Sequence, residues 1–424
     1  MRPSRDWRLV VALGCLGWTV LYAGRSVLSP ALGAIGQEWG LDPAQLGLLS
    51  SIFFVGYAGL QIPAGMLADR IGKKGILVAG FALFAVATVL RGLAPSYGTA
   101  LAAGLLAGLA QATYYATMFS ISSSSVPAAR RGLGSAIVYS GMALGSSGGY
   151  LLASLVAVGL GWTWRTPFLV LAGPAVVMAG LFALLLREPK RVGGEPKRVG
   201  GAPKRVGGAP GPAAEAGRHR TTLGTPFRAV LTPRLLRAYL LNFCSLYAFF
   251  MLLTWLPYYL EFERGVAGSV SGLVASLMPW ASIPSGLLVS VLSDRKRSRV
   301  GPLRWLLPGA AVAVLGIAIG RGAVVLYGAL ILYGLLGKST TDPLLVAEVA
   351  EHAPAERSAT ALAVLNFAGM VASVLAPYAT GLLIQAFGDM RPAFYLAAAI
   401  LLVGCAVSLR SAGRPGTPGF GREL

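Results

Sequence analysis

Charged residues are scarce in this chain of 424 residues, making up 12% of it against roughly 25% in a soluble domain. Histidine and cysteine are rarer still, with two and three residues. Cys15, Cys244 and Cys405 stand singly inside apolar runs, without the spacing of a disulfide or metal framework. His219 and His352 lie in separate polar segments, and the sequence contains no phosphate-binding glycine loop. The sequence therefore argues against an enzyme and predicts neither a cofactor nor a metal site.

Apolar residues make up 55% of the sequence and gather in continuous runs. A helix needs about 20 apolar residues to cross roughly 30 Å of hydrocarbon, and these runs reach that length. They lack the short alternating pattern of a membrane β-barrel. The sequence predicts an all-α membrane protein with twelve spans, at residues 9–34, 44–67, 75–93, 98–122, 132–158, 164–186, 235–260, 268–292, 302–320, 323–347, 358–387 and 392–409. The first run is too long for a signal peptide, so we expect it to remain as the first span.

The positive charges predict how the spans are oriented. Of the 36 Lys and Arg residues, 29 fall on one side of the predicted membrane, five fall on the other side, among them Arg91, and Arg25 and Lys338 lie within spans. The positive-inside rule then places both termini in the cytoplasm, which we expect for a multi-pass protein of the plasma membrane. Because the formal net charge of +20 sits mainly in loops beside the membrane, the expected partner is the lipid bilayer and not nucleic acid.

An internal repeat at an offset near 225 residues divides the spans into two halves. We expect an N-terminal six-helix half at 1–186, a cytoplasmic linker at 187–232, a C-terminal six-helix half at 233–410 and a cytoplasmic tail at 411–424. The proline and glycine of the linker predict a disordered basic tether. Halves of the same topology are parallel repeats, which place a substrate site between them near the membrane midplane. The matching residues are Tyr22-Ala23 and Tyr247-Ala248, Asp69-Arg70 and Asp294-Arg295, Arg131 and Arg357, and Gly141-Met142 and Gly369-Met370.

A charged turn, Gly65-Met66-Leu67-Ala68-Asp69-Arg70-Ile71-Gly72-Lys73-Lys74, joins the second and third spans. Gly65 lets two helix ends approach closely, and Gly72 permits a sharp turn. The pattern resembles the signature of the major facilitator superfamily, and the resemblance extends over nearly the whole chain. It implies a transporter of two six-helix bundles that works by alternating access, with this turn as a latch of the outward-facing state. The alternative is simple anchoring by positive charge. The predicted latch residues are Gly65, Asp69, Arg70, Gly72, Lys73, Asp294 and Arg295.

Arg25 lies deep in the first span, about nine residues or roughly 14 Å from its outer end, which is beyond the reach of a snorkelling side chain. Tyr22, Arg25 and Ser29 share one helical face. A charge at this depth is costly unless it faces a cavity or a partner. Because a guanidinium presents a planar fork suited to carboxylate or phosphate, we predict that Arg25 and Tyr22 bind an anionic substrate. The alternative is a structural arginine satisfied by backbone carbonyls and neighbouring helices.

Lys338 and Asp342 lie four residues apart in the tenth span, on one face and within reach of an ion pair. Pro343 follows directly and predicts a break or kink. We expect Lys338 to bind substrate and Asp342 to carry a coupling proton, unless the pair is structural and only neutralises itself. Polar groups for a hydroxylated substrate are also expected at four positions, although aromatic side chains more often pack than bind. These are Gln111, Tyr114, Tyr115 and Tyr247.

Tyr22-x-x-Arg25 and Thr254-Trp255-Leu256-Pro257-Tyr258-Tyr259-Leu260 resemble the anion:cation symporters, which carry sugar acids and related carboxylates. The organophosphate:phosphate antiporters share Tyr-x-x-Arg, but they have an arginine where this chain has Phe250. The resemblance implies a monomeric transporter of a small organic anion, a sugar acid or carboxylate, with Asp342 as the remaining coupling group. Two alternatives stay open: an efflux antiporter for drugs and lipophilic compounds, and a membrane receptor that transports nothing.

Overall fold

The computed structural model describes residues 7–127, 130–186, 227–296, 301–354 and 358–409. All regular elements in these ranges are helical. The first half of the chain contains α1 (Trp7–Ser26), α2 (Leu28–Trp39), α3 (Pro43–Ile71), α4 (Lys73–Gly92), α5 (Tyr97–Ala112), α6 (Tyr114–Ser125), α7 (Arg131–Ala153), a π-helical turn (Ser154–Gly159) and α8 (Thr166–Leu185). The second contains a 3₁₀ turn (Phe227–Val230), α9 (Pro233–Phe262), α10 (Gly268–Lys296), α11 (Leu303–Ile319), α12 (Ala323–Leu336), α13 (Lys338–His352), α14 (Ser358–Phe387) and α15 (Arg391–Leu409).

The predicted twelve-span all-α fold is confirmed. Eight of the described helical stretches are both long and apolar enough to cross a membrane. Three spans are each built from two helices, because α1–α2, α5–α6 and α12–α13 are interrupted at Val27, Thr113 and Gly337. The break expected at Pro343 is instead at Gly337, and Pro343 lies inside α13. Gly337 takes an extended conformation (φ −79°, ψ −150°) that ends the helical hydrogen-bond ladder of α12 before the proline is reached.

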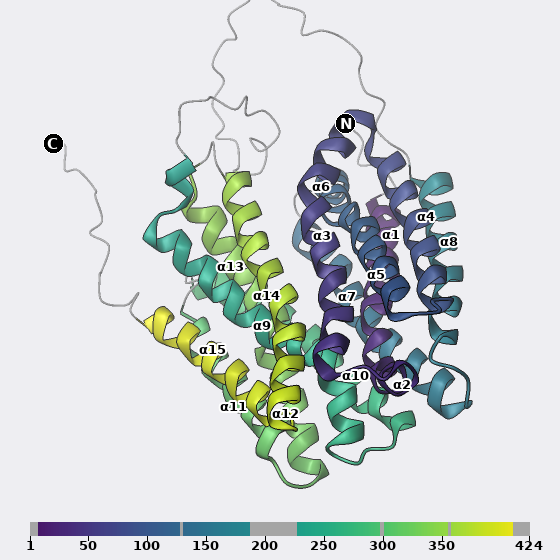
Figure 1. Ribbon diagram of the computed structural model, residues 1–424. Helices are drawn as coiled ribbons and strands as arrows, with labels where there is room; N and C mark the ends of the chain where they lie inside the picture. Colours follow the sequence, from purple (N-terminus) through teal and green to yellow (C-terminus); the bar gives the residue numbers. More distant parts are fainter. Residues whose placement is uncertain (1–6, 128–129, 187–226, 297–300, 355–357, 410–424) are drawn as a thin grey trace, which may run out of the picture.

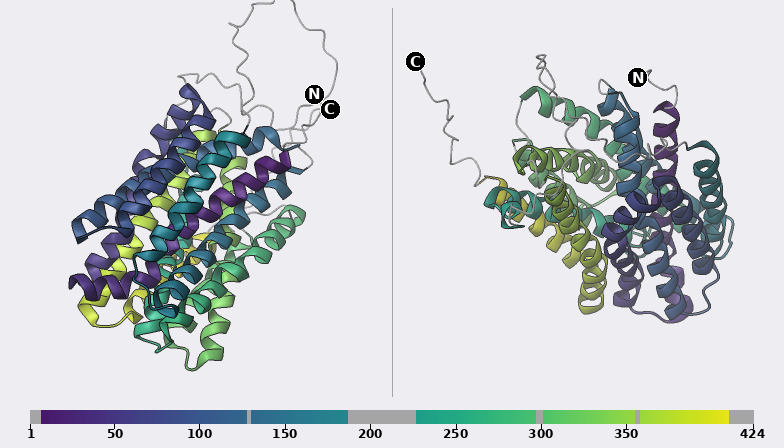
Figure 2. Two further views of the ribbon diagram at one scale, coloured as in Figure 1. Left: turned by 90° about the vertical axis from the view of Figure 1, so that its right-hand side faces the viewer. Right: turned by 90° about the horizontal axis from the view of Figure 1, so that it is seen from above.

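Helices α1 to α8 form one bundle and α9 to α15 form the other, and the two lie side by side (Figure 1). The view from above in Figure 2 shows each bundle on its own side of the molecule. Helix α3 packs on α14, and α7 packs on α10, so these four helices make most of the seam between the bundles. The predicted linker and tail fall largely on residues 187–226 and 410–424, outside the described ranges, so the domain boundaries stay predictions.

Two glycines mark the two ends of the bundles, which we call the Gly72 end and the Gly40 end. Gly72 joins α3 to α4 with φ 111°, and Gly40 joins α2 to α3 with φ 63°. Both are conformations that a residue with a Cβ rarely adopts, so each tight turn depends on glycine. Lys73 begins α4 and donates a hydrogen bond to the hydroxyl of Ser120 in α6 (2.5 Å). Helix α3 continues into the charged turn and ends at Ile71, beyond the predicted end of the span at residue 67.

The structure does not test the latch role of most of the other predicted residues. Gly65 leaves a built Cβ 3.8 Å from Ala116, an ordinary contact distance. Arg70 is exposed in the last turn of α3. The side chains of Asp69, Asp294 and Arg295 lie outside the described part of the structure, so the latch remains a prediction.

The seam between the bundles is tight toward the Gly40 end. A Cβ built on Gly47 would lie 2.4 Å from the carbonyl oxygen of Pro377, so only glycine allows α3 and α14 this close. Ser51 of α3 donates to the carbonyl of Val374 in α14 (2.6 Å). Tyr150 of α7 donates to the carbonyl of Leu253 in α9 (2.7 Å). These close contacts with the backbone of the C-terminal bundle join the two bundles on that side of the midplane.

Candidate functional site

Arg25 lies in the last turn of α1, where its guanidinium is surrounded by aromatic rings. The guanidinium carbon lies 4.4 Å from the ring centre of Tyr22, 4.8 Å from that of Tyr57, 5.5 Å from that of Phe53 and 5.6 Å from that of Phe54. A cation over an aromatic face gains about 0.5–2 kcal/mol. These rings therefore hold the charge without neutralising it.

Gln111 fixes the orientation of Arg25 from the fourth span. Its Oε1 accepts a hydrogen bond from Arg25 Nε, and its Nε2 donates to the backbone carbonyl of Leu21 (3.0 Å). Nη2 of Arg25 is buried without a hydrogen-bond partner. Within the described ranges no carboxylate lies at ion-pair distance from Arg25. A half-buried guanidinium held by neutral groups, with a buried Nη2 that has no partner, is suited to an anion.

Lys338 and Asp342 form the predicted ion pair, with Nζ and Oδ2 2.5 Å apart. Lys338 is the first residue of α13, directly after the break at Gly337, and its ammonium lies 5.3 Å from the ring centre of Phe249. Its side chain is 12% exposed and that of Asp342 is 24% exposed. Oδ1 of Asp342 is buried and has no hydrogen-bond partner. The pair is therefore electrically neutral but only partly satisfied.

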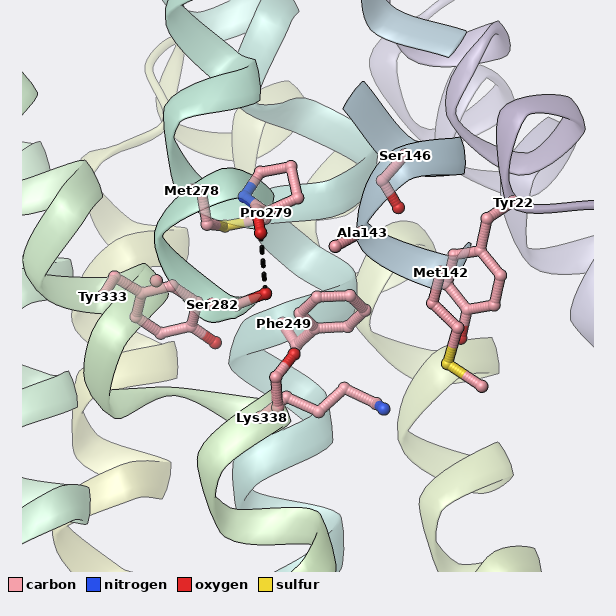
Figure 3. A pocket seen from close by; sticks show the side chains of 12 residues that line it. Tyr22, Met142, Ala143, Ser146, Phe249, Met278, Pro279, Ser282, Tyr333 and Lys338 are labelled. Carbon is pink, nitrogen blue, oxygen red and sulfur yellow. Dashed lines mark hydrogen bonds between the residues drawn. The ribbon is translucent and has the colours of Figure 1, made fainter. Parts of the chain in front are cut away.

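A central pocket lies between the two bundles next to these charges. Its empty volume, which includes space open to solvent, is about 410 Å³. Figure 3 shows Lys338 reaching from the C-terminal half toward Tyr22 and Met142 of the N-terminal half. The predicted residues Tyr22 and Lys338 both line it, and Arg25 lies one turn from Tyr22. The lining also includes Ser146, Phe249, Met278, Ser282 and Tyr333.

Three other predicted site residues are placed differently from one another. Tyr115 is half-buried and lies within electrostatic range of Lys338 and Asp342. Tyr114 faces the interior of the first bundle, where its hydroxyl donates to the carbonyl of Gly14 (2.8 Å). Tyr247 is 4% exposed and packs beside Phe243. None of these three tyrosines is among the lining residues of the central pocket.

The sequence reasoning missed several lining residues. Tyr333, in α12, is almost fully buried and its hydroxyl has no hydrogen-bond partner, so it is a free donor and acceptor beside Lys338. Ser282 of α10 donates to the carbonyl of Pro279 (2.7 Å; Figure 3). Tyr333 stands in the apolar helix α12, and Ser282 stands between two prolines of α10, so no local pattern distinguished them. Only the packing of α10 against α12 brings them to the pocket.

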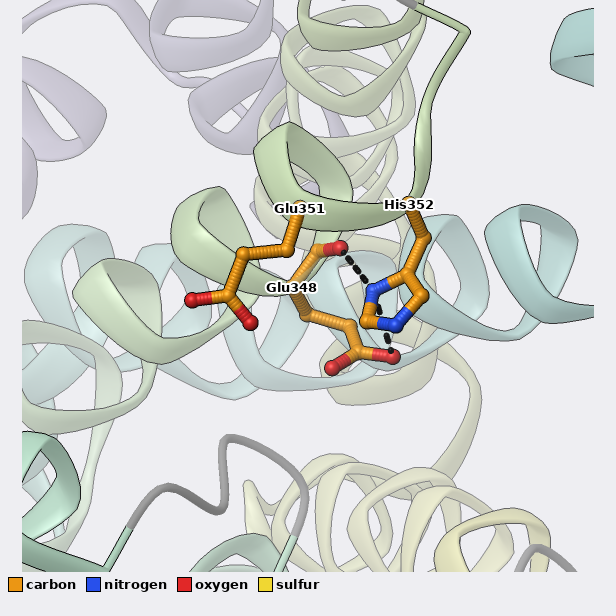
Figure 4. Close-up of side chains that lie close together, drawn as sticks. All are labelled: Glu348, Glu351 and His352. Carbon is orange, nitrogen blue, oxygen red and sulfur yellow. Dashed lines mark hydrogen bonds and ion pairs between the residues drawn. The ribbon is translucent and has the colours of Figure 1, made fainter. Parts of the chain in front are cut away.

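A second group of titratable residues lies at the Gly72 end of α13 (Figure 4). Glu348 pairs with Arg234 of α9 through Oε1 and Nε, which are 2.7 Å apart. Nδ1 of His352 lies 3.5 Å from the same Oε1 and 2.8 Å from the Glu348 carbonyl oxygen. Glu351 adds a third side chain within 4.8 Å. Arg234 neutralises Glu348. The ion pair joins the start of α9 to the end of α13 within one bundle.

A protein of two similar six-span bundles with charged groups at a central pocket has the architecture of a secondary transporter. The model of the Major Facilitator Superfamily matches residues 14–377 and, in a further match, residues 336–423. The chain therefore belongs to the Major Facilitator Superfamily, a family of membrane transporters. The resemblance that the charged turn indicated is thereby confirmed.

Curated relatives match over almost the whole chain. A probable sulfoacetate transporter of Cupriavidus necator is 28% identical over 409 residues, which cover 95% of this chain and 93% of that protein. A probable galactarate/D-glucarate transporter of Bacillus subtilis is 25% identical over 414 residues, covering 92% and 88%. A solved structure of a bacterial homologue of the human lysosomal transporter Spinster, described as inward-facing and unoccupied, has a TM-score of 0.76 at 18% identity, covering 96% and 97% of the two chains.

Proposed function

We propose that this transporter moves a small organic anion, of the sugar-acid or carboxylate type, by alternating access between the two bundles. The observation that carries the proposal is Arg25. Its guanidinium lies inside the membrane span, is held by Gln111 and aromatic rings, and keeps a buried Nη2 without a partner. An unpaired charge at this depth is unfavourable, so binding of an anionic substrate would lower the free energy of the site. The relatives named for sulfoacetate and galactarate or glucarate support the same class of substrate.

In this proposal the substrate spans the seam. One anionic group lies against Arg25, with Tyr22 and Tyr115 beside it, and the rest of the molecule reaches Lys338 and the hydroxyl of Tyr333 in the other half. A ligand that touches both bundles has different contacts in each conformation, because the bundles rock against each other around it. Gln111 acts through Arg25, since both ends of its amide are already engaged.

The Lys338–Asp342 pair offers a route for proton coupling. While Asp342 is ionised it neutralises Lys338, so Arg25 supplies the net positive charge of the site. Protonation of Asp342 would release Lys338 for a second carboxylate of the substrate. A dianion and one proton would then bind together and bring the net charge of the site from +1 to zero. We infer that coupling, where it occurs, depends on this exchange of partners at Lys338.

We further propose that the Gly72 end faces the cytoplasm of a plasma membrane and that the protein works as a monomer. The support is the distribution of Lys and Arg, 29 of which belong to the side that includes Arg70 and Lys73. The charged turn and its echo at Asp294 and Arg295 would latch the outward-facing conformation, in which the Gly72 end is closed.

Uptake into proteoliposomes driven by a pH gradient tests the proposal. The anions would be labelled sulfoacetate, D-glucarate and D-galactonate, with a neutral sugar and a lipophilic cation as controls. Each is measured on the native protein, on Arg25→Ala, and on Arg321→Ala, which removes an exposed arginine at the Gly40 end. We expect anion uptake that is lost in Arg25→Ala and kept in Arg321→Ala. Transport of the cation alone, unaffected by Arg25→Ala, would identify an efflux antiporter; binding of an anion without uptake would identify a receptor.

A further inference from the structure

A second pocket lies on the Gly40 side of Arg25, and we call it the outer pocket. Its empty volume, which includes space open to solvent, is about 330 Å³. Its lining includes Arg25, Ser29, Ser50, Phe53, Arg91 and Thr254. All but Arg25 come from the parts of their helices nearer the Gly40 end, including the last turn of α4, which contains Arg91. Arg25 lines the outer pocket, and Tyr22, one helical turn away, lines the central pocket.

Arg91 is the unusual feature of this pocket. The sequence counts it among the charges on the outer side, at the end of the predicted span 75–93, and the structure buries it in the last turn of α4, where it is only 5% exposed. Its Nη2 donates to the carbonyl of Leu49 (3.1 Å), and its guanidinium lies 5.4 Å from the ring centre of Phe168. Across the described ranges it has no further hydrogen bond and no carboxylate at ion-pair distance. The charge is therefore buried with one neutral acceptor.

Other arginines at the same end show what a purely structural role looks like. Arg165 forms a two-pronged ion pair with Glu38, with contacts of 2.6 and 2.7 Å. Arg264 donates from Nη2 to the carbonyls of Ile317 and Gly320, at 3.0 and 2.5 Å, and its Nε is buried without a partner. Arg91 could extend to water from the end of its helix, as long basic side chains do, but it turns inward to the outer pocket.

Gly104 of α5 lies beside the guanidinium of Arg91. A Cβ built on Gly104 would lie 3.2 Å from Cγ2 of Ile52 and 3.7 Å from Arg91 Nη2. Two cations, Arg91 and Arg25, face one cavity together with the polar residues Ser29 and Ser50. Like charges that share a buried cavity repel one another, and a bound anion converts that repulsion into attraction.

We propose that the outer pocket is a second anion-binding site, in which Arg91 and Arg25 hold a carboxylate of the substrate on its way between the outer face and the central pocket. The inference rests on the proposed function, since it assumes an anionic substrate. Arg25 serves both pockets: the anion exchanges Arg91 for Lys338 as its second cation while it stays on Arg25. The outer pocket raises affinity for anions that arrive from the Gly40 face.

The test measures KM from each membrane face, using labelled D-glucarate in vesicles of defined sidedness. The variants are Arg91→Gln, which removes the charge, and Ser50→Leu, which fills the pocket and keeps both arginines. Arg321→Gln is the matched control. Losing a charge-assisted hydrogen bond corresponds to about tenfold or more in affinity. We expect both variants to raise KM about tenfold from the Gly40 face and less than about twofold from the Gly72 face, and the control to change neither.

The possible results separate this inference from the proposed function. If Arg91→Gln and Ser50→Leu elute and melt like the native protein and keep its KM from the Gly40 face, the outer site is refuted while anion transport stands. An equal rise in KM from both faces would also refute it, because it would assign Arg91 to the general structure. If Arg91→Gln does not fold, Ser50→Leu decides the question. A native protein that carries none of the panel anions would refute the proposed function, and the outer site with it.

Discussion

Replacing Arg25 by lysine separates the charge of this residue from its shape. Lysine keeps a positive charge in the ring of aromatic side chains, but it is a point charge on a flexible stem and cannot present a planar fork. In the structure the fork is divided between two tasks: Nε donates to Gln111, and Nη2 is left for an anion. Arg25→Lys therefore removes the substrate bond, or the bond to Gln111, because one ammonium cannot supply both in the same geometry.

The size of the effect follows from these contacts. A hydrogen bond that involves a charged group contributes about 1.5–3 kcal/mol. Loss of one such bond to the substrate corresponds to roughly a 10- to 150-fold weaker affinity, at about 1.4 kcal/mol for each factor of ten. We expect Arg25→Lys to raise the Kd for D-glucarate by that factor, and Arg25→Ala to raise it further because the charge is lost too.

Isothermal titration calorimetry of the purified protein in detergent measures this Kd directly, with Arg321→Lys as the control at an exposed arginine. Equal thermal stability of the variants establishes that the site alone has changed. An affinity of Arg25→Lys within about twofold of the native value would refute the reasoning, since charge without a fork would then be sufficient. The same result in Arg25→Ala would remove Arg25 from the binding site altogether.

The remaining predictions concern the support of Arg25, the coupling group and the helix packing. Gln111→Leu leaves Arg25 Nε without its acceptor, so we expect KM for uptake to rise about tenfold with little change in kcat; an unchanged KM would contradict the positioning role. Asp342→Asn cannot bind or release a proton, so uptake should lose its dependence on the pH gradient while exchange of labelled for unlabelled substrate continues; gradient-driven accumulation in this variant would rule Asp342 out. Gly108→Ala would place a Cβ 1.9 Å from the carbonyl oxygen of Phe53 and should destabilise the protein by roughly 1–3 kcal/mol, seen as a lower Tm, whereas Gly98→Ala has no heavy atom within 4 Å and should melt like the native protein.

The sequence by itself determined the spans and the charges within them. Hydrocarbon has a fixed thickness and offers no hydrogen bonds, so each crossing must be a helix of about 20 apolar residues, and such runs can be read without knowing their neighbours. The same cost makes a charge within a span informative, which is why Arg25, Lys338 and Asp342 could be identified as candidates. The ion pair of Lys338 with Asp342 followed from helical spacing alone.

Only the tertiary structure decided which side chains meet. Gln111 and Tyr114 lie three residues apart and both bond α1, but Gln111 reaches Arg25 and Leu21 whereas Tyr114 reaches Gly14, away from the central pocket. Gln111 reaches Arg25 across 86 residues, and Tyr333 reaches the central pocket because α12 packs on α10. Arg91 was counted among the outer charges because it stands near the end of an apolar run. Its position along the helix does not reveal the direction in which its side chain points. The rotation of each helix about its axis is set by its neighbours, through contacts such as those of Gly47 with Pro377, and no periodicity within one span contains that information.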